Sequence, residues 1–146
     1  MPLATILTPE MIDLLKKVVR LTRDGSLAWE VTADPDVLVA PLGGDYSVKI
    51  QRVPDFSDDE ESADIPDQVV TIAKGRRELF TLDRRDFNNL TTFRAAFADT
   101  LVRPADGPYP IFKELWDRAY FKAAKIEDEV SAINRLLDTK MRGGGA

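Results

Sequence analysis

Any chemistry in this chain would have to use carboxylates, lysine amines or hydroxyls, because its 146 residues include neither histidine nor cysteine. Their absence removes the side chain that titrates near neutral pH, the thiol nucleophile and the usual soft metal ligands. We therefore expect no cofactor, no metal and no enzymatic activity. The alternative is an enzyme that works through paired carboxylates or hydroxyls.

Two short motifs match catalytic or phosphate-binding patterns only in part. Ser47 and Lys49 lie two residues apart on an expected strand and so share a face, as a nucleophile and its base would. The alternation with apolar residues such as Val48 turns that face to solvent, so we interpret the pair as surface residues. Gly43-Gly44 precedes a strand and lacks the lysine and hydroxyl that open a helix in a phosphate-binding loop.

The densest charge cluster is acidic. Seven carboxylates fall within residues 54–67, and four are consecutive: Asp58, Asp59, Glu60 and Glu61. The segment lacks the alternating ligands, central glycine and closing glutamate of an EF-hand loop. We interpret it as a solvated loop. In the alternative interpretation it attracts a basic partner, as in an immunity- or inhibitor-type protein.

A basic cluster lies around the last expected hairpin: Lys74, Arg76, Arg77, Arg84 and Arg85. These side chains either contact phosphates or pair with Asp83, Asp86 and the acidic segment. The whole chain has a net charge of −5 and a pI of about 4.8. That balance disfavours nucleic acid and anionic membranes, so we expect neither as a partner.

A helix and then a series of strands are expected in the first half of the chain. Thr8-Pro9 is typical of a helix start and Asp24-Gly25 of a helix end, which predicts a helix over residues 9–23. After it, apolar and polar residues alternate as in half-buried strands. The alternation predicts a five-stranded antiparallel meander, with strands over 27–32, 37–42, 46–51, 69–72 and 79–82.

The last third of the chain is predicted to be helical. A short helix that Asp86 could cap falls within 87–101, and a proline-rich loop covers 103–110. Apolar residues then recur at alternating steps of four and three, which predicts one continuous helix over 110–140. Such a helix is about 45 Å long, whereas a domain of this size is about 30–40 Å across. It must therefore break or extend beyond its own domain.

The second half of this helix carries a narrow apolar stripe flanked by charges: Ile126, Val130, Ile133 and Leu137. We favour packing of this stripe on the N-terminal helix of the same chain, and the alternative is contact with a second copy or another protein. We expect residues 1–140 to form one domain and residues 141–146 a disordered tail. The fold class is α+β, with an N-terminal helix, the meander, a short helix and a long C-terminal helix packed on one sheet face.

Residues 22–29, Thr-Arg-Asp-Gly-Ser-Leu-Ala-Trp, resemble a junction found in small uncharacterised bacterial proteins. Those proteins have a helix ending in T-x-x-G, L-x-W on the first strand, a meander and a final long helix. The resemblance implies the order of elements and no activity or site. The segment around 86–107 and the acidic loop depart from that shorter pattern.

The protein is expected to be a non-enzymatic protein-interaction or regulatory module, and dimerisation through the C-terminal helix is one arrangement that the stripe leaves open. No apolar run approaches the ~20 residues that cross a bilayer. The N-terminus does not look like a secretory signal, and no disulfide can form. These features predict a cytoplasmic protein that binds a protein partner or itself.

Overall fold

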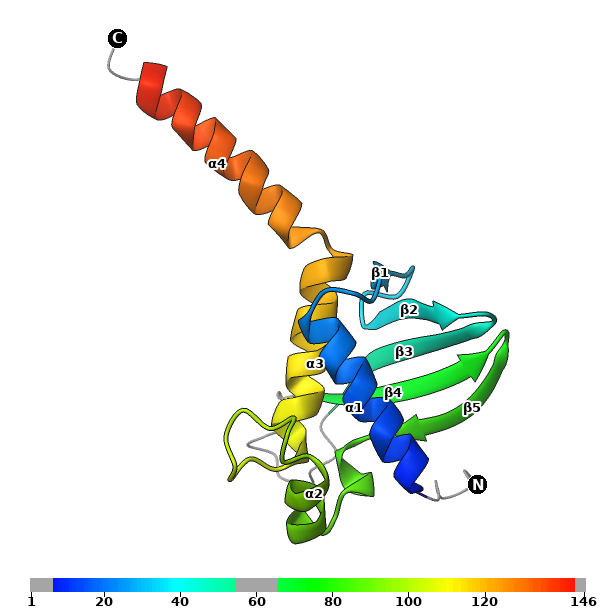
Figure 1. Ribbon diagram of the computed structural model, residues 1–146. Helices are drawn as coiled ribbons and strands as arrows, with labels where there is room; N and C mark the ends of the chain where they lie inside the picture. The colour runs from blue at the N-terminus through cyan, green and yellow to red at the C-terminus, as the bar shows by residue number, and fades with distance from the viewer. Residues whose placement is uncertain (1–6, 55–65, 144–146) are drawn as a thin grey trace.

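The computed structural model describes residues 7–54 and 66–143, which form an α+β fold (Figure 1). The helices are α1 (Pro9–Arg23), α2 (Leu90–Ala96), α3 (Pro108–Ala123) and α4 (Ile126–Gly143), with a short 3-10 helix, η2 (Arg84–Asp86). The strands are β1 (Glu30–Val31), β2 (Val37–Gly43), β3 (Tyr46–Val53), β4 (Asp67–Lys74) and β5 (Arg77–Leu82). The fold class and the order of elements predicted from the sequence are confirmed.

The N-terminal helix begins and ends where the sequence predicts. The Thr8 hydroxyl accepts a hydrogen bond from the backbone N–H of Met11 at 3.2 Å. At the other end Gly25 has a φ of 79°, a conformation that costs glycine little. The Asp24 carboxylate accepts the backbone N–H of Ser26 at 2.9 Å, which holds the turn that leaves the helix.

The five strands pair in chain order, β1-β2-β3-β4-β5, and all neighbouring pairs are antiparallel. The turn between β2 and β3 contains Gly43 and Gly44, whose φ values are 115° and 57°. Residues with a side chain rarely adopt such φ values, so this turn favours glycine. Pro41 lies in the part of β2 that has no β1 partner. The strand is an edge there, and a missing N–H is tolerated.

The first strand is shorter than predicted, because only Glu30–Val31 pairs with β2, not 27–32. Trp29 precedes this strand and is nevertheless buried, as is Leu27. The indole Nε1 of Trp29 donates a hydrogen bond to the Thr22 hydroxyl at 3.0 Å. Side-chain packing therefore anchors this segment to the end of α1 in place of a strand ladder.

Figure 1 shows α1 and α3 on one face of the sheet. Two rows of buried apolar side chains belong to the core on this face. The strand register aligns one row as Leu38, Ile50, Val70 and Leu82, and the other as Ala40, Val48 and Ile72. None of these side chains is more than 3% exposed. The helix α3 contacts β1, β2, β3 and β4, and α1 packs along α3. Thus α3 is the helix that lies across the sheet.

The helix predicted within 87–101 is confined to α2. The side chain of Asn89 caps it by accepting the backbone N–H of Thr92 at 3.0 Å. Asp86, the cap expected from the sequence, instead belongs to η2, where it forms a capping box with Asp83. Within the predicted range 87–101 the seven residues Leu90–Ala96 are helical, and η2 precedes that range.

Four phenylalanine rings join α2 to α3. Phe93 and Phe97 stack with their ring centroids 4.7 Å apart. Phe87 meets both rings edge-on at 5.4 and 5.5 Å, and it lies 6.0 Å from Phe112 of α3. All four side chains are buried. This cluster packs α2 and the segment before it against the N-terminal part of α3.

The prediction of one continuous helix over 110–140 is wrong. The helix α3 ends at Ala123 and α4 begins at Ile126. Figure 1 shows α4 leaving the sheet and pointing away from the rest of the chain. A helix of the predicted length must break or extend beyond its domain, and this chain does both.

The favoured interpretation, that the apolar stripe packs on the N-terminal helix, is also wrong. The helix α1 lies along α3, and none of the described residues of α4 is buried. In addition, α4 continues to Gly143, three residues into the segment 141–146 that was expected to be a tail.

Candidate functional site

The α3–α4 junction is made by one residue in an unusual conformation. Lys125 has a φ of 55° and is the one described non-glycine residue with a positive φ. This conformation costs a side-chain-bearing residue about 1–2 kcal/mol. The N–H of Ala124 donates to the carbonyl of Tyr120 at 2.8 Å and closes α3. The carbonyl of Lys125 accepts the N–H of Glu129 at 3.1 Å and starts α4.

Acidic side chains stabilise the new helix start. The first turn of α4 contains three consecutive carboxylates, Glu127, Asp128 and Glu129. Negative charge is favourable near a helix N-terminus, where backbone N–H groups lack intrahelical partners. In a continuous helix the same residues would lie mid-helix and gain nothing from this effect. The acidic first turn therefore offsets part of the cost of the break.

The apolar stripe of α4 faces solvent. Among the residues predicted to bind a partner, Val130, Ile133 and Leu137 are 48%, 52% and 50% exposed, and Ile126 is partly buried next to the junction. Steps of four, three and four place all four on one side of the helix. The structure thus places the four stripe residues on one side of α4, and no other element of the described chain covers them.

Two further apolar residues of α4 were not identified from the sequence. Leu136 and Met141 are the most exposed of the large apolar side chains of α4, at 66% and 81%. Leu136 follows Ile133 by three residues and Met141 follows Leu137 by four, so both border the stripe. That spacing is the signal that could have found them.

Charge is divided along α4. Residues 126–134 contain three carboxylates and no basic side chain. Residues 135–143 contain three basic side chains and one carboxylate: Arg135, Lys140, Arg142 and Asp138. The two halves of the exposed helix are therefore of opposite sign.

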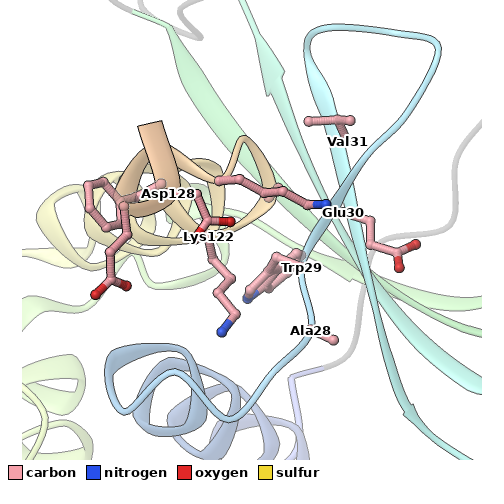
Figure 2. A pocket seen from close by; sticks show the side chains of 10 residues that line it. Ala28, Trp29, Glu30, Val31, Lys122 and Asp128 are labelled. Carbon is pink, nitrogen blue, oxygen red and sulfur yellow. The ribbon is translucent and has the colours of Figure 1, made fainter. Parts of the chain in front are cut away.

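A groove of about 550 Å³ lies between the junction and the segment that enters β1. Figure 2 shows Trp29, Val31 and Lys122 gathered there with Asp128 of α4. A second groove, of about 670 Å³, lies between the end of α1 and α3, and Phe121 lines both. The grooves flank the base of α4 and contain charges of both signs.

An ion-pair network crosses the second groove. The Glu114 carboxylate accepts hydrogen bonds from Arg23 Nε and Nη2 at 2.8 and 2.7 Å, and from Arg118 Nε at 2.7 Å. The hydrogen bonds from Arg23 hold the pKa of Glu114 below its usual range, and they raise the pKa of Arg23. This network ties the end of α1 to the middle of α3.

Glu114→Gln is expected to lower the free energy of unfolding by about 1 kcal/mol at neutral pH, because a partly buried charged hydrogen bond is lost. The pKa of Glu114 is lowered from 4.5 in the folded protein. Its contribution is therefore present above that value and lost as the pH falls through the folded-state pKa. The difference between wild type and variant should shrink below about pH 4.5 in urea titrations.

Glu78→Gln is the matched control, because Glu78 forms a surface pair with Lys49 at 3.2 Å and its side chain is 60% exposed. Its loss should cost much less than 1 kcal/mol. A stability difference at Glu114 that does not depend on pH would contradict the role of this carboxylate.

The catalytic candidates are not assembled into a site in the described part of the chain. Lys49 shares a sheet face with Ser47, as predicted, and its amine pairs with Glu78. Burial raises the pKa of the Asp86 carboxyl, but that group accepts the Asp83 backbone N–H at 2.8 Å in the capping box. Within residues 7–54 and 66–143, no three carboxylates gather as a metal site would require.

The basic cluster is partly used within the fold. Arg84 pairs with Asp67 and Arg85 with Asp83, as the alternative interpretation predicted. The side chain of Lys74 lies over the ring of Tyr46 at 5.7 Å. The consecutive acidic residues Asp58, Asp59, Glu60 and Glu61 lie outside the described residues, so their role stays a prediction from the sequence.

Comparison with known proteins adds no relative. No match to a protein family, a curated protein or a solved structure was found. The helices that the structure describes are each too short or too polar to cross a bilayer. The candidate site therefore depends on the geometry of α4 and its junction.

Proposed function

We propose that the protein is a non-enzymatic protein-interaction module that associates with a second copy through the apolar stripe of α4. The observation that carries this proposal is the exposure of the helix. Five large apolar side chains of α4 are between 48% and 81% exposed: Val130, Ile133, Leu136, Leu137 and Met141. An amphipathic helix is normally stabilised by burying its apolar face, and contiguous exposed apolar surface is typical of binding sites.

The hydrophobic core contains no described side chain of α4. It is built from α1, α2, α3 and the sheet. The hydrogen bonds at Ala124 and Lys125 end α3 and begin α4, so the two helices are separate elements. A helix that stabilises no core and projects its apolar face supports a role in association.

Ile133→Asp tests the proposal. It places a charge in the middle of the stripe, and burying an unpaired carboxylate is strongly unfavourable. We expect a wild-type mass that rises with concentration from 16.3 kDa toward twice that value in sedimentation equilibrium. The variant should associate at least ~100-fold more weakly, which corresponds to about 2.7 kcal/mol.

Ser131→Asp is the control, since it adds the same charge on the opposite side of α4 at an exposed residue. It should leave the mass unchanged. Because Ile133 is half exposed, neither substitution should alter the unfolding curve of the domain at concentrations where the wild type is monomeric. A wild-type mass of one chain at every concentration, or equal loss in both variants, would reject the proposal.

A further inference from the structure

We infer that two copies of α4 pair antiparallel, with Val130 against the second copy's Ile133 and Leu137 against the second copy's Ile126. The inference rests on the proposed function and adds the partner geometry. Three features of α4 carry it: the heptad positions of the stripe, the division of charge along the helix, and the length of the apolar contact.

The spacing of the stripe is compatible with two-fold antiparallel packing. Val130 and Leu137 are seven residues apart, as are Ile126 and Ile133, so the pairs occupy the two core positions of a heptad. In an antiparallel pair, residues of one core position face those of the other. One register then places all four residues of each helix opposite an apolar residue, around a two-fold axis that crosses the stripe midway between Val130 and Ile133. The same patch is used twice, as a symmetric dimer requires.

The charges distinguish this arrangement from a parallel one. In a parallel pair the acidic starts of the two helices, Glu127, Asp128 and Glu129 in each copy, would lie side by side. In the antiparallel register residues 127–129 lie level with residues 134–136 of the second copy, which contain Arg135 and no carboxylate, so the two acidic starts lie at opposite ends of the contact. The helix dipoles also oppose each other favourably. Electrostatic complementarity sets orientation in this way when both orientations bury the same apolar residues.

The contact is short. From Ile126 to Leu137 the helix rises about 17 Å, at 1.5 Å per residue. An interface of this length falls in the small class, below about 1,200 Å². Association should therefore depend on concentration.

Cysteine cross-linking tests the orientation, and the chain has no cysteine of its own to interfere. Leu137→Cys and Ile126→Cys are prepared separately, one of them isotope-labelled so that mass spectrometry identifies mixed dimers. In the antiparallel register Cys pairs form only between the two variants. Two copies of Leu137→Cys would hold their thiols about 16 Å apart along the axis, too far for a disulfide.

After mild oxidation we expect mixed disulfide dimers at least ~10-fold more abundant than dimers of either variant alone. Efficient self-cross-linking of Leu137→Cys would show a parallel pair and overturn the inference while leaving the proposed function intact. No cross-link in any sample, at concentrations where the mass is dimeric, would overturn this register. A monomeric wild type would instead reject the proposed function itself.

Discussion

Phe97→Ala is expected to lower the free energy of unfolding by about 3–5 kcal/mol. The Phe97 side chain is fully buried. Its ring stacks on Phe93 at 4.7 Å and meets Phe87 at 5.5 Å. Truncation removes these contacts and leaves a cavity, because the surrounding rings belong to separate elements that cannot all close in. Domains of this kind are stable by about 5–15 kcal/mol, so the loss is a large fraction of the total.

Urea unfolding followed by circular dichroism measures the effect, and the transition midpoint should fall with little change in its slope. Phe121→Ala is the matched control, since the same side chain is 48% exposed on α3. It should cost less than about 1 kcal/mol. Equal losses at the two positions would contradict the packing described for the phenylalanine cluster. The cluster matters for the proposed function because Phe112 belongs to α3, which directs α4 outward.

Asp67→Ala is expected to cost about 3 kcal/mol, because it leaves a cation without its buried counter-ion. The Asp67 side chain is 3% exposed and accepts Arg84 Nε at 2.5 Å and Nη2 at 3.1 Å. Arg84 is 31% exposed, so water partly compensates its charge and the cost falls at the low end of the range for buried pairs. The pair joins the start of β4 to η2.

Asp36→Ala is the comparison that isolates burial. Asp36 accepts Arg52 Nε and Nη2 at 3.0 and 2.8 Å, but the two side chains are 48% and 41% exposed. Its loss should cost about 0.2–1 kcal/mol and depend on ionic strength. Thermal and urea unfolding at low and high salt would measure both variants. A similar cost for the two substitutions would show that the Asp67–Arg84 pair is not effectively buried.

Local signals in the sequence predicted the elements that depend on neighbouring residues. The cap at Thr8 and the turn at Gly25 defined α1, since both act within one helical turn. The alternation of apolar residues predicted the sheet, and the register aligns Leu38 with Ile50 as that alternation requires. The first strand is shorter than the alternation predicts, because side-chain packing of Trp29 replaces backbone pairing there.

Local sequence signals do not predict contacts between residues that are distant in the chain. Arg23 and Glu114 are 91 residues apart, and nothing in either neighbourhood indicates the pair. The break at Lys125 carries no glycine or proline, and alanine and lysine favour helix, so the periodicity continues across it. The sequence shows three carboxylates after the break, but whether they lie in the first turn of a helix depends on where α3 ends.

The sequence by itself determined the types of element, their order and the existence of an apolar stripe in α4, because periodicity and capping act over a few residues. Only the tertiary structure decided that α3 covers the sheet while α4 projects from it with the stripe uncovered. Periodicity shows which face of a helix is apolar. Whether that face is buried depends on what packs against it, and in this protein the sheet and α1 are occupied by α3.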